Sequence, residues 1–417
     1  MADTLGIIAL LVCALVTLIL AVRHPSIGVV LFVALSVRAA AALFHFYVAP
    51  LPDGTSDAVS FEQNAWEWSQ GGFSAALGHF EGPDSYFYSW LMSLLYAITD
   101  RSLLMLQATS VLAGVFCVFF AWQLARELWD SSSARKVAWL MALFPMVVQY
   151  GALTMREVWI VLFFILGLIG VVRWAKIGGL GPAVGGIAAF VVATFFHGGM
   201  FVAILAFLSL ICAREGKRML NGLYRGRIAI FAFIGLIAIV SAIAGYVGSG
   251  ISLPKLGTAL DAVDLQSWIA RSQYQQSLED AGARYGDWLV ASQPIDFLWI
   301  VPIKSFYLIF APFPWDLRAP QHIIGLVDAL LYLSLTFYAL RYRKSIWANP
   351  GSRAVLLIFL AMVLAFGVGT GNFGTGMRHR AKFVVALFVL AAPKIPQLIL
   401  LRSKNSASSA TSAIGKK

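Results

Sequence analysis

Carboxylates, arginines and histidines that can do chemistry gather in three short segments of this sequence. In the first segment, Asp53 and Asp57 lead into an aromatic stretch that contains Glu62. A carboxylate just beyond the end of an apolar helix is well placed to act as a general base on a hydroxyl group. Two carboxylates in one loop can also share a divalent cation such as Mg²⁺ or Mn²⁺. The alternative is an ordinary acidic loop in solvent.

The second segment is the pair Arg156-Glu157, which interrupts two long apolar runs. In a polar cavity facing the outer side of a membrane, Arg156 can bind a phosphate or pair with Asp57. The alternative is a hairpin tip in which Glu157 sits near the N-terminus of the next helix, where the helix dipole favours an anion. The local sequence leaves both interpretations open.

The third segment is Arg378-His379-Arg380, with Lys382 two residues further on. Two arginines in this position can hold a pyrophosphate through bidentate hydrogen bonds. Three glycines just before them allow the backbone to approach a ligand closely. The alternative is a group of charges that meets lipid head groups.

Four more polar residues stand within or between apolar runs. His197 lies in a tight connection, where a histidine is more often a polar cap than a catalyst. Lys304 can extend its amine to a membrane interface or bind a phosphate. Arg38 lies inside an expected helix, and we expect a carboxylate of the first segment as its partner. Asp328 has no partner that the sequence identifies.

The amino-acid composition indicates the class of protein that holds these residues in place. The chain has 417 residues, of which 60% are hydrophobic and 12% are charged, and its mean hydropathy is +0.80. A typical soluble domain has about 25% charged residues, so this chain has too little polar surface to cover a globule in water. Its apolar runs are long and do not alternate, which is typical of membrane helices and not of barrel strands. The sequence therefore predicts an all-α polytopic membrane protein.

About 11 transmembrane helices are expected in the hydropathy pattern. They cover residues 5–22, 28–48, 103–125, 137–154, 157–174, 181–196, 199–213, 228–246, 323–340, 354–370 and 381–401. Two shorter apolar stretches, 85–98 and 297–312, are expected to be interfacial or re-entrant, because counting either as a span would move a basic cluster to the outer side. Cys13, Cys117 and Cys212 fall within apolar runs and are expected to be small buried side chains.

Basic clusters at alternate helix ends predict the orientation of the chain. By the positive-inside rule these clusters are cytoplasmic, which places the N-terminus outside and the C-terminus inside. The same placement argues against nucleic-acid binding as the reason for the net charge of +11. We expect one transmembrane domain over residues 1–401, with outer loops at 49–84 and 247–296, and a disordered cytoplasmic tail at 402–417.

Taken together, these segments resemble the GT-C superfamily of integral membrane glycosyltransferases. The resemblance is carried by Asp57-Ala58-Val59-Ser60-Phe61, by the stretch from Tyr86 to Tyr96, by Phe144-Pro145 followed by Arg156-Glu157, and by Arg378-His379-Arg380. These resemble, in order, the catalytic Asp, a short helix that returns to the membrane, a charged helix hairpin and a late arginine motif. The resemblance is diffuse and covers roughly residues 40–200 and 300–400.

The resemblance implies a GT-C-like fold and an inverting transfer of a sugar from a polyprenyl-(pyro)phosphate donor to a glycan or lipid-linked acceptor. It places the protein in a bacterial cytoplasmic membrane, with the active face periplasmic. Asp57 is the implied general base, and Arg378 and Arg380 are the implied ligands of the donor phosphate. The family's acidic pair is adjacent, whereas Asp53 and Asp57 are spaced apart, so the choice of base between them stays open.

Other residues complete the expected site. Asp53 and Glu157 join Asp57 as catalytic candidates, Arg156 and Lys304 join the phosphate-binding set, and Glu62, His197 and His379 are candidates for support. An O-antigen polymerase, which joins polysaccharide repeat units, is the alternative within the same chemistry. A transporter or flippase of lipid-linked sugars is the alternative from another class. The middle sections of the expected helices are mostly apolar, and the charged residues gather at one membrane face. Both features favour the enzyme over the transporter.

Overall fold

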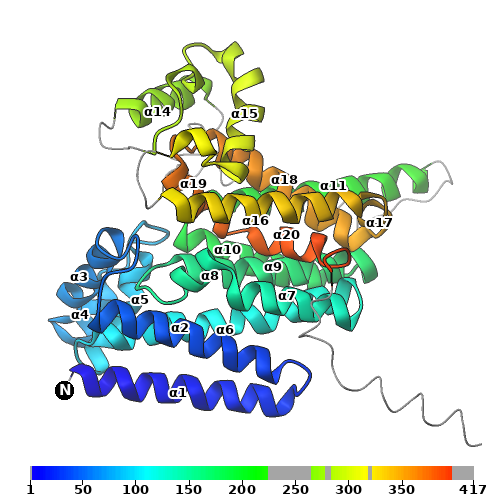
Figure 1. The fold of residues 1–417 in the computed structure, drawn as a ribbon. Coiled ribbons are helices and arrows are strands. Elements are labelled where there is room, and N and C mark those ends of the chain that lie inside the picture. The colour runs from blue at the N-terminus through cyan, green and yellow to red at the C-terminus, as the bar shows by residue number, and fades with distance from the viewer. Residues whose placement is uncertain (1, 224–263, 278–282, 318–321, 397–417) are drawn as a thin grey trace, which may run out of the picture.

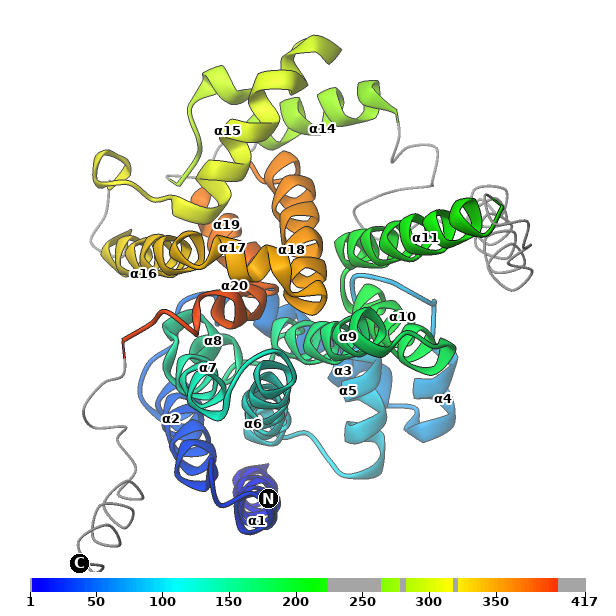
Figure 2. The same ribbon diagram turned by 90° about the vertical axis from the view of Figure 1, so that its right-hand side faces the viewer.

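The computed structural model describes residues 2–223, 264–277, 283–317 and 322–396, and these residues are predominantly helical (Figure 1). The long helices lie side by side along a common direction, lengthwise in Figure 1 and closer to end-on in Figure 2. Within the described residues the one strand-type pairing is an isolated β-bridge between Arg284 and Asn372. The predicted all-α class is confirmed.

The helices follow one another along the chain with short connections. The first half forms α1 (Ala2–Arg23), α2 (Gly28–Tyr47), α3 (Asp57–Ser69), α4 (Gly72–Gly78), α5 (Phe87–Ile98), α6 (Leu103–Leu128), α7 (Ser131–Leu143), α8 (Pro145–Tyr150), α9 (Glu157–Ile177), α10 (Leu180–Phe196), the 3-10 turn η1 (Gly198–Met200) and α11 (Phe201–Leu223). The second half forms α14 (Leu265–Ser277), the turns η2 (Asp287–Leu289) and η3 (Pro294–Asp296), α15 (Phe297–Phe310), the turn η4 (Pro314–Asp316), α16 (His322–Arg341), α17 (Arg343–Ala348), α18 (Pro350–Val368), α19 (Phe373–Ala381) and α20 (Val384–Ala391).

Seven of the described helices are long and apolar enough to cross a membrane. They are α1, α2, α6, α9, the η1–α11 segment, α16 and α18. The expected span at 137–154 is divided into α7 and α8 at Pro145, which has no N–H to continue the helix. The expected span at 228–246 and the end of the one at 381–401 lie outside the described residues. The total number of spans stays a prediction.

The two short apolar stretches form helices that are too short to span. α5 has 12 residues and α15 has 14, which gives lengths of about 18 and 21 Å at ~1.5 Å per residue, against a bilayer core of about 30 Å. α15 runs across the direction of α16 in both views, and α5 lies across the long helices in Figure 2. Both orientations agree with the prediction that these segments do not cross.

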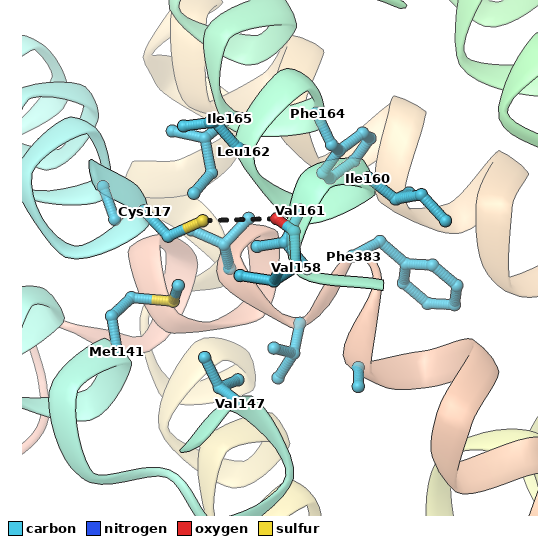
Figure 3. Close-up of a cluster of buried hydrophobic side chains, with 14 of the residues drawn as sticks. Cys117, Met141, Val147, Val158, Ile160, Val161, Leu162, Phe164, Ile165 and Phe383 are labelled. Carbon is cyan, nitrogen blue, oxygen red and sulfur yellow. Dashed lines mark hydrogen bonds between the residues drawn. The ribbon is translucent and has the colours of Figure 1, made fainter. Parts of the chain in front are cut away.

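The core lies around α6 and α9, the two most buried of the seven candidate spans. Figure 3 shows Cys117 of α6 facing Val158 of α9, and the Cys117 thiol donates to the Val158 carbonyl at 3.5 Å. Cys13 is also buried and Cys212 is half-buried, and all three are free thiols, as expected. One end of this packed core carries the charged residues described next.

α9 and α10 pack backbone against backbone through glycines. A Cβ on Gly170 of α9 would lie 2.5 Å from the Cα of Gly186 on α10. Gly170 therefore has no room for a Cβ, because the nearest atoms are backbone atoms of α10 that cannot move without shifting the helix. The contact fixes the position of α9, whose first residue is Glu157.

Candidate functional site

The three charged segments of the sequence meet at one end of the helical bundle. Asp57 is the first residue of α3 and Glu157 is the first residue of α9, positions at which the helix dipole stabilises a carboxylate. Arg378 of α19 lies between them: its Nε donates to Glu157 Oε1 at 2.6 Å, and its Nη1 donates to Asp57 Oδ2. We call Asp57, Arg156, Glu157, Arg378 and Lys382 the carboxylate–arginine cluster.

α19 presents Arg378 because its N-terminus is firmly capped. Asn372 Oδ1 accepts the backbone N–H of Thr375 at 2.7 Å, which starts the helix six residues before the arginine. The Arg378 side chain is 17% exposed. Burial acts to lower the pKa of Arg378, but the charges of Glu157 and Asp57 outweigh burial and raise it. Arg378 is therefore a permanent cation fixed between two carboxylates.

Lys382 is the second cation on the same side of the segment. Its Nζ lies 3.8 Å from Glu157 Oε1 and 5.8 Å from the centre of the Phe366 ring. Residues four apart along a helical turn lie on one face, so Arg378 and Lys382 both reach the buried Glu157 carboxylate. The sequence analysis named Lys382 only as a neighbour of the arginines. Its position four residues after Arg378 already indicated that the two side chains share one face of the helix.

Arg156 joins the cluster from the connection before α9. It is 3% exposed, donates from Nη1 to the Ser85 carbonyl at 2.8 Å and lies 5.3 Å from the centre of the Phe61 ring. Both interpretations of the Arg156-Glu157 pair therefore describe the geometry: Glu157 begins a helix, and the pair lies within a polar cluster.

Three polar atoms of the cluster are buried without a hydrogen-bond partner among the described residues. They are the donors Arg378 Nη2 and Arg156 Nε and the acceptor Glu157 Oε2. Most buried polar atoms in proteins are paired, so each exception calls for an explanation. Two guanidinium groups with spare donors can bind an anion such as a phosphate.

Asp53 lies near the cluster but has another partner. The Tyr150 hydroxyl donates to Asp53 Oδ2 at 2.8 Å. Burial, and then the charge of Asp53, raises the pKa of Tyr150, which keeps the hydroxyl protonated. Asp53 has φ 61°, a left-handed conformation that aspartate tolerates better than most residues. Asp53 and Asp57 thus face different partners. The described residues contain no group of three or more His, Cys, Asp or Glu placed to hold a metal ion, so we name no metal ligands.

Arg380 does not reach the cluster, contrary to the expected pairing with Arg378. Its Nη2 lies 2.6 Å from Asp328 Oδ2, and both side chains are fully buried. Its Nη1 also donates to the Ala311 carbonyl at 2.6 Å. Each residue of an α-helix is rotated by about 100° from the one before it. Side chains two residues apart therefore lie on nearly opposite faces, so Arg378 and Arg380 cannot share one phosphate here. Arg380 is therefore not part of the proposed site. Its ion pair gives Asp328 the partner that the sequence does not identify.

The prediction that Arg38 pairs with a carboxylate of the first segment is wrong. Arg38 donates to no carboxylate in the described structure but to the carbonyls of Met141 at 2.7 Å and Ala142 at 3.1 Å, as well as to one in its own helix. Pro145 explains this contact: it lacks the N–H that would bond to Met141 four residues earlier. Arg38 supplies the missing donor at the point where α7 ends.

Glu62, one of the predicted supporting residues, lies outside the cluster. It accepts from Arg101 at 2.9 and 2.8 Å and from the Tyr96 hydroxyl at 3.0 Å, which ties α3 to α5. Lys304 is buried in α15 and makes no ion pair with a carboxylate of the described residues; burial lowers the pKa of its amine to about 8. Neither residue contacts the cluster by hydrogen bond or ion pair.

The two histidines lie beside each other behind the cluster. The ring centres of His197 and His379 are 5.6 Å apart. His197 Nδ1 accepts the Gly199 N–H at 3.1 Å, which is the polar-cap role. Thr370 donates its only hydroxyl proton to the Phe366 carbonyl, so His379 Nδ1, at 2.9 Å from the Thr370 oxygen, carries a proton and donates it.

This arrangement defines a class: an all-α membrane protein with a charged site at one end of an apolar helical bundle. The chain matches no family model, no curated protein and no solved structure. The proposed function therefore rests on the geometry of the carboxylate–arginine cluster.

Proposed function

We propose that the protein is an inverting membrane glycosyltransferase that takes a sugar or oligosaccharide from a polyprenyl-(pyro)phosphate donor on the outer face of a cytoplasmic membrane. The observation that carries the proposal is Arg378, held between a buried Glu157 and a half-exposed Asp57 at the end of an apolar bundle. A lipid-linked sugar phosphate needs these two groups together: a cation for the phosphate, and a carboxylate for the incoming hydroxyl.

Asp57 is the group best placed to accept a proton. Its side chain is 50% exposed, whereas that of Glu157 is 1% exposed. The acceptor oxygen forms a bond to the anomeric carbon while the bond from that carbon to the phosphate oxygen breaks. The electron pair stays on the phosphate, and the hydroxyl proton passes to an oxygen of Asp57. Attack opposite the leaving phosphate inverts the anomeric centre.

The cations stabilise the leaving phosphate. Arg378 Nη2 and Arg156 Nε both have unused hydrogen-bonding capacity among the described residues. Guanidinium groups fixed in a water-poor site stabilise charge that develops during bond cleavage. Glu157 keeps Arg378 in place when a phosphate competes with Asp57 for the guanidinium. Donor binding then releases Asp57 from its ion pair and frees its carboxylate oxygen for the acceptor hydroxyl, so the donor binds before the acceptor.

The decisive experiment measures glycosidic bond formation by the full chain in lipid nanodiscs. Radiolabelled sugars on undecaprenyl phosphate and undecaprenyl pyrophosphate serve as donors, with a membrane glycolipid extract as acceptor. We expect transfer by the wild type and by the control Asp100→Asn, whose carboxylate lies on an exposed turn. We expect Asp57→Asn to lose about two to four orders of magnitude, the usual contribution of a general base.

Three outcomes decide the proposal. Full turnover by Asp57→Asn removes that residue as the base. Unchanged donor binding by Arg378→Lys removes the phosphate assignment, because lysine cannot reproduce the fork of a guanidinium. Movement of the donor across proteoliposome membranes without any new glycosidic bond supports the flippase instead. Successive addition of repeat units to one product identifies the polymerase form of the same reaction.

A further inference from the structure

A pocket lined by aromatic side chains lies beside the cluster, between α3, α4 and α5. Its walls include Trp68, His79, Phe80 and Trp90, with Glu81 and Asp84 at its edge. Figures 1 and 2 show α3, α4 and α5 grouped together at one edge of the bundle. None of the residues of the carboxylate–arginine cluster lines this pocket.

The rings are held by one another. Trp68 stacks on His79 with ring centres 5.2 Å apart and planes 10° apart, and Phe80 lies 4.7 Å from Trp90. Phe87 stacks on Trp90 at 5.6 Å and lies 6.3 Å from Phe80, so the three rings contact one another. Mutual packing fixes aromatic side chains before a ligand arrives, so little rotamer entropy is lost when it binds.

The polar groups of the pocket include the indole N–H of Trp90, the Tyr86 hydroxyl, the His79 ring and two carboxylates. Trp90 Nε1 is buried and has no hydrogen-bond partner among the described residues. Glu81 is exposed and Asp84 is half-buried. Lysine and arginine are absent from the described residues that line the pocket. Aromatic faces suit the apolar C–H faces of a sugar ring, and carboxylates accept from its hydroxyl groups.

Side-chain contacts link the pocket to the carboxylate–arginine cluster. Arg156 donates to the Ser85 carbonyl at 2.8 Å and lies over the Phe61 ring, and Phe61 is 6.1 Å from Tyr86, which lines the pocket. Asp57 is the first residue of α3 and Trp68 lies in its last turn, so an oligosaccharide that follows α3 can place one ring among the aromatics and another near Asp57. The two ends of this surface have opposite charge: cations at the cluster and carboxylates at the pocket.

We propose that this pocket is the acceptor subsite, and that it binds a neutral or amino sugar and rejects an acidic one. As an acceptor subsite it rests on the proposed function. Glu81 and Asp84 repel a uronate carboxylate and attract an amino group. The discrimination separates the acceptor, which binds among carboxylates, from the anionic phosphate of the donor, which binds among arginines.

The test measures sugar binding by the full chain in nanodiscs, without any donor. The probes are the tetramers of N-acetylglucosamine, glucosamine and galacturonic acid, and binding is followed by ligand-observed NMR. We expect the first two to bind and galacturonate to bind at least about tenfold more weakly. Trp68→Ala and Trp90→Ala each weaken binding about threefold to tenfold, as expected for the loss of one stacking partner.

Matched controls keep the outcome interpretable. Trp288→Ala removes an exposed tryptophan outside the pocket and leaves binding unchanged. Glu81→Gln weakens binding of the glucosamine tetramer and spares the N-acetylglucosamine tetramer. Elution volume and thermal midpoint verify folding; if Trp90→Ala does not fold, Trp68→Ala carries the test. Equal binding by Trp68→Ala and wild type, or equal binding of galacturonate, overturns the proposal.

Two further readings separate the alternatives. The exposed Phe73, Leu77 and Phe80 around α4 suit a lipid interface. Because the chain has 13 tryptophans, the Trp68 signal is the difference between wild type and Trp68→Ala; quenching of that difference by brominated lipid, without sugar binding, assigns the pocket to the membrane. Arg378→Ala retains sugar binding if the pocket acts as proposed. Absence of glycosyl transfer by the wild type, with sugar binding retained, therefore refutes the enzyme and not the sugar site.

Discussion

The groups that an arginine contacts determine its role, as Arg38, Arg378 and Arg380 show. Arg38 donates to backbone carbonyls left open by a proline, and Arg380 is paired with the buried Asp328. Arg378 alone bridges a half-exposed carboxylate and retains an unused donor among the described residues. Arg38 also keeps an unpaired Nε among the described residues, so the feature that distinguishes Arg378 is its half-exposed partner Asp57, through which a ligand can reach the guanidinium.

The Arg378–Glu157 pair gives a prediction about stability. Arg378→Gln and Glu157→Gln should each lower the thermal midpoint, because each leaves a buried charge without its main partner. The double variant should lose less than the sum, with a coupling of roughly 0.5–3 kcal/mol in a double-mutant cycle. Thermal unfolding in one detergent measures all four proteins.

An exposed pair of the same residue types is the control for this cycle. Arg173 and Glu127 make an ion pair at 2.6 Å with side-chain exposures of 51% and 24%. Exposed pairs contribute about 0–1 kcal/mol, so the cycle at these positions should show little coupling. Equal coupling at both sites contradicts the view that burial gives the Arg378–Glu157 pair its strength.

Helix positions follow from hydropathy, whereas helix interruptions follow from single residues. The long apolar runs predicted α1, α2, α6, α9, α16 and α18, since a span needs only length and apolarity. The stretch 137–154 was predicted as one helix, yet Pro145 divides it. The pairing of Arg380 with Asp328 was beyond prediction, because hydropathy states which residues are buried and not which helices are neighbours. The family resemblance placed the three segments in one expected site, and the structure adds the contacts of Arg378 with Asp57 and Glu157, which no local pattern predicts.

The glycine contact between α9 and α10 gives a prediction at this scale. Gly170→Ala should destabilise the protein by about 1–3 kcal/mol, the usual cost of overpacking, because its Cβ would lie 2.5 Å from backbone atoms of Gly186. Gly185→Ala on α10 is the matched control, since its Cβ meets nothing within 4 Å. We expect the control to match or slightly exceed wild type, because alanine favours helix by roughly 0.5–1 kcal/mol.

The readout for the glycine pair is the thermal midpoint together with glycosyl transfer. Gly170→Ala moves α9, which begins with Glu157, so we expect transfer to fall along with stability. A Gly170→Ala protein as stable as Gly185→Ala means that the two helices separate easily, and it removes the argument that this contact positions the cluster.

Among the described residues, charged side chains lie at both ends of the α6–α9 core. At the end where α6 and α9 finish, Arg173 pairs with Glu127, and Arg214 of α11 donates to the Trp174 carbonyl at 2.8 Å. The other end of α9 carries Glu157 and the cluster. α9 has 21 residues, so the two ends are about 30 Å apart at ~1.5 Å per residue, the thickness of a bilayer core. From the positive-inside rule we predict that the cluster lies on the outer side.

That orientation can be measured by cysteine labelling in intact expressing cells. Ser74→Cys lies on the exposed α4 beside the cluster, and Ser131→Cys lies at the exposed start of α7, at the basic end. A membrane-impermeant maleimide should label Ser74→Cys in intact cells and Ser131→Cys only after permeabilisation. Wild type is the control for the native thiols, of which Cys13 and Cys117 are buried and Cys212 is half-buried. The reverse pattern places Asp57 and Arg378 on the cytoplasmic side. A carboxylate–arginine cluster in that position meets donors before they are moved across the membrane, and the proposed outer-face transfer must then be abandoned even if the chemistry at Asp57 stands.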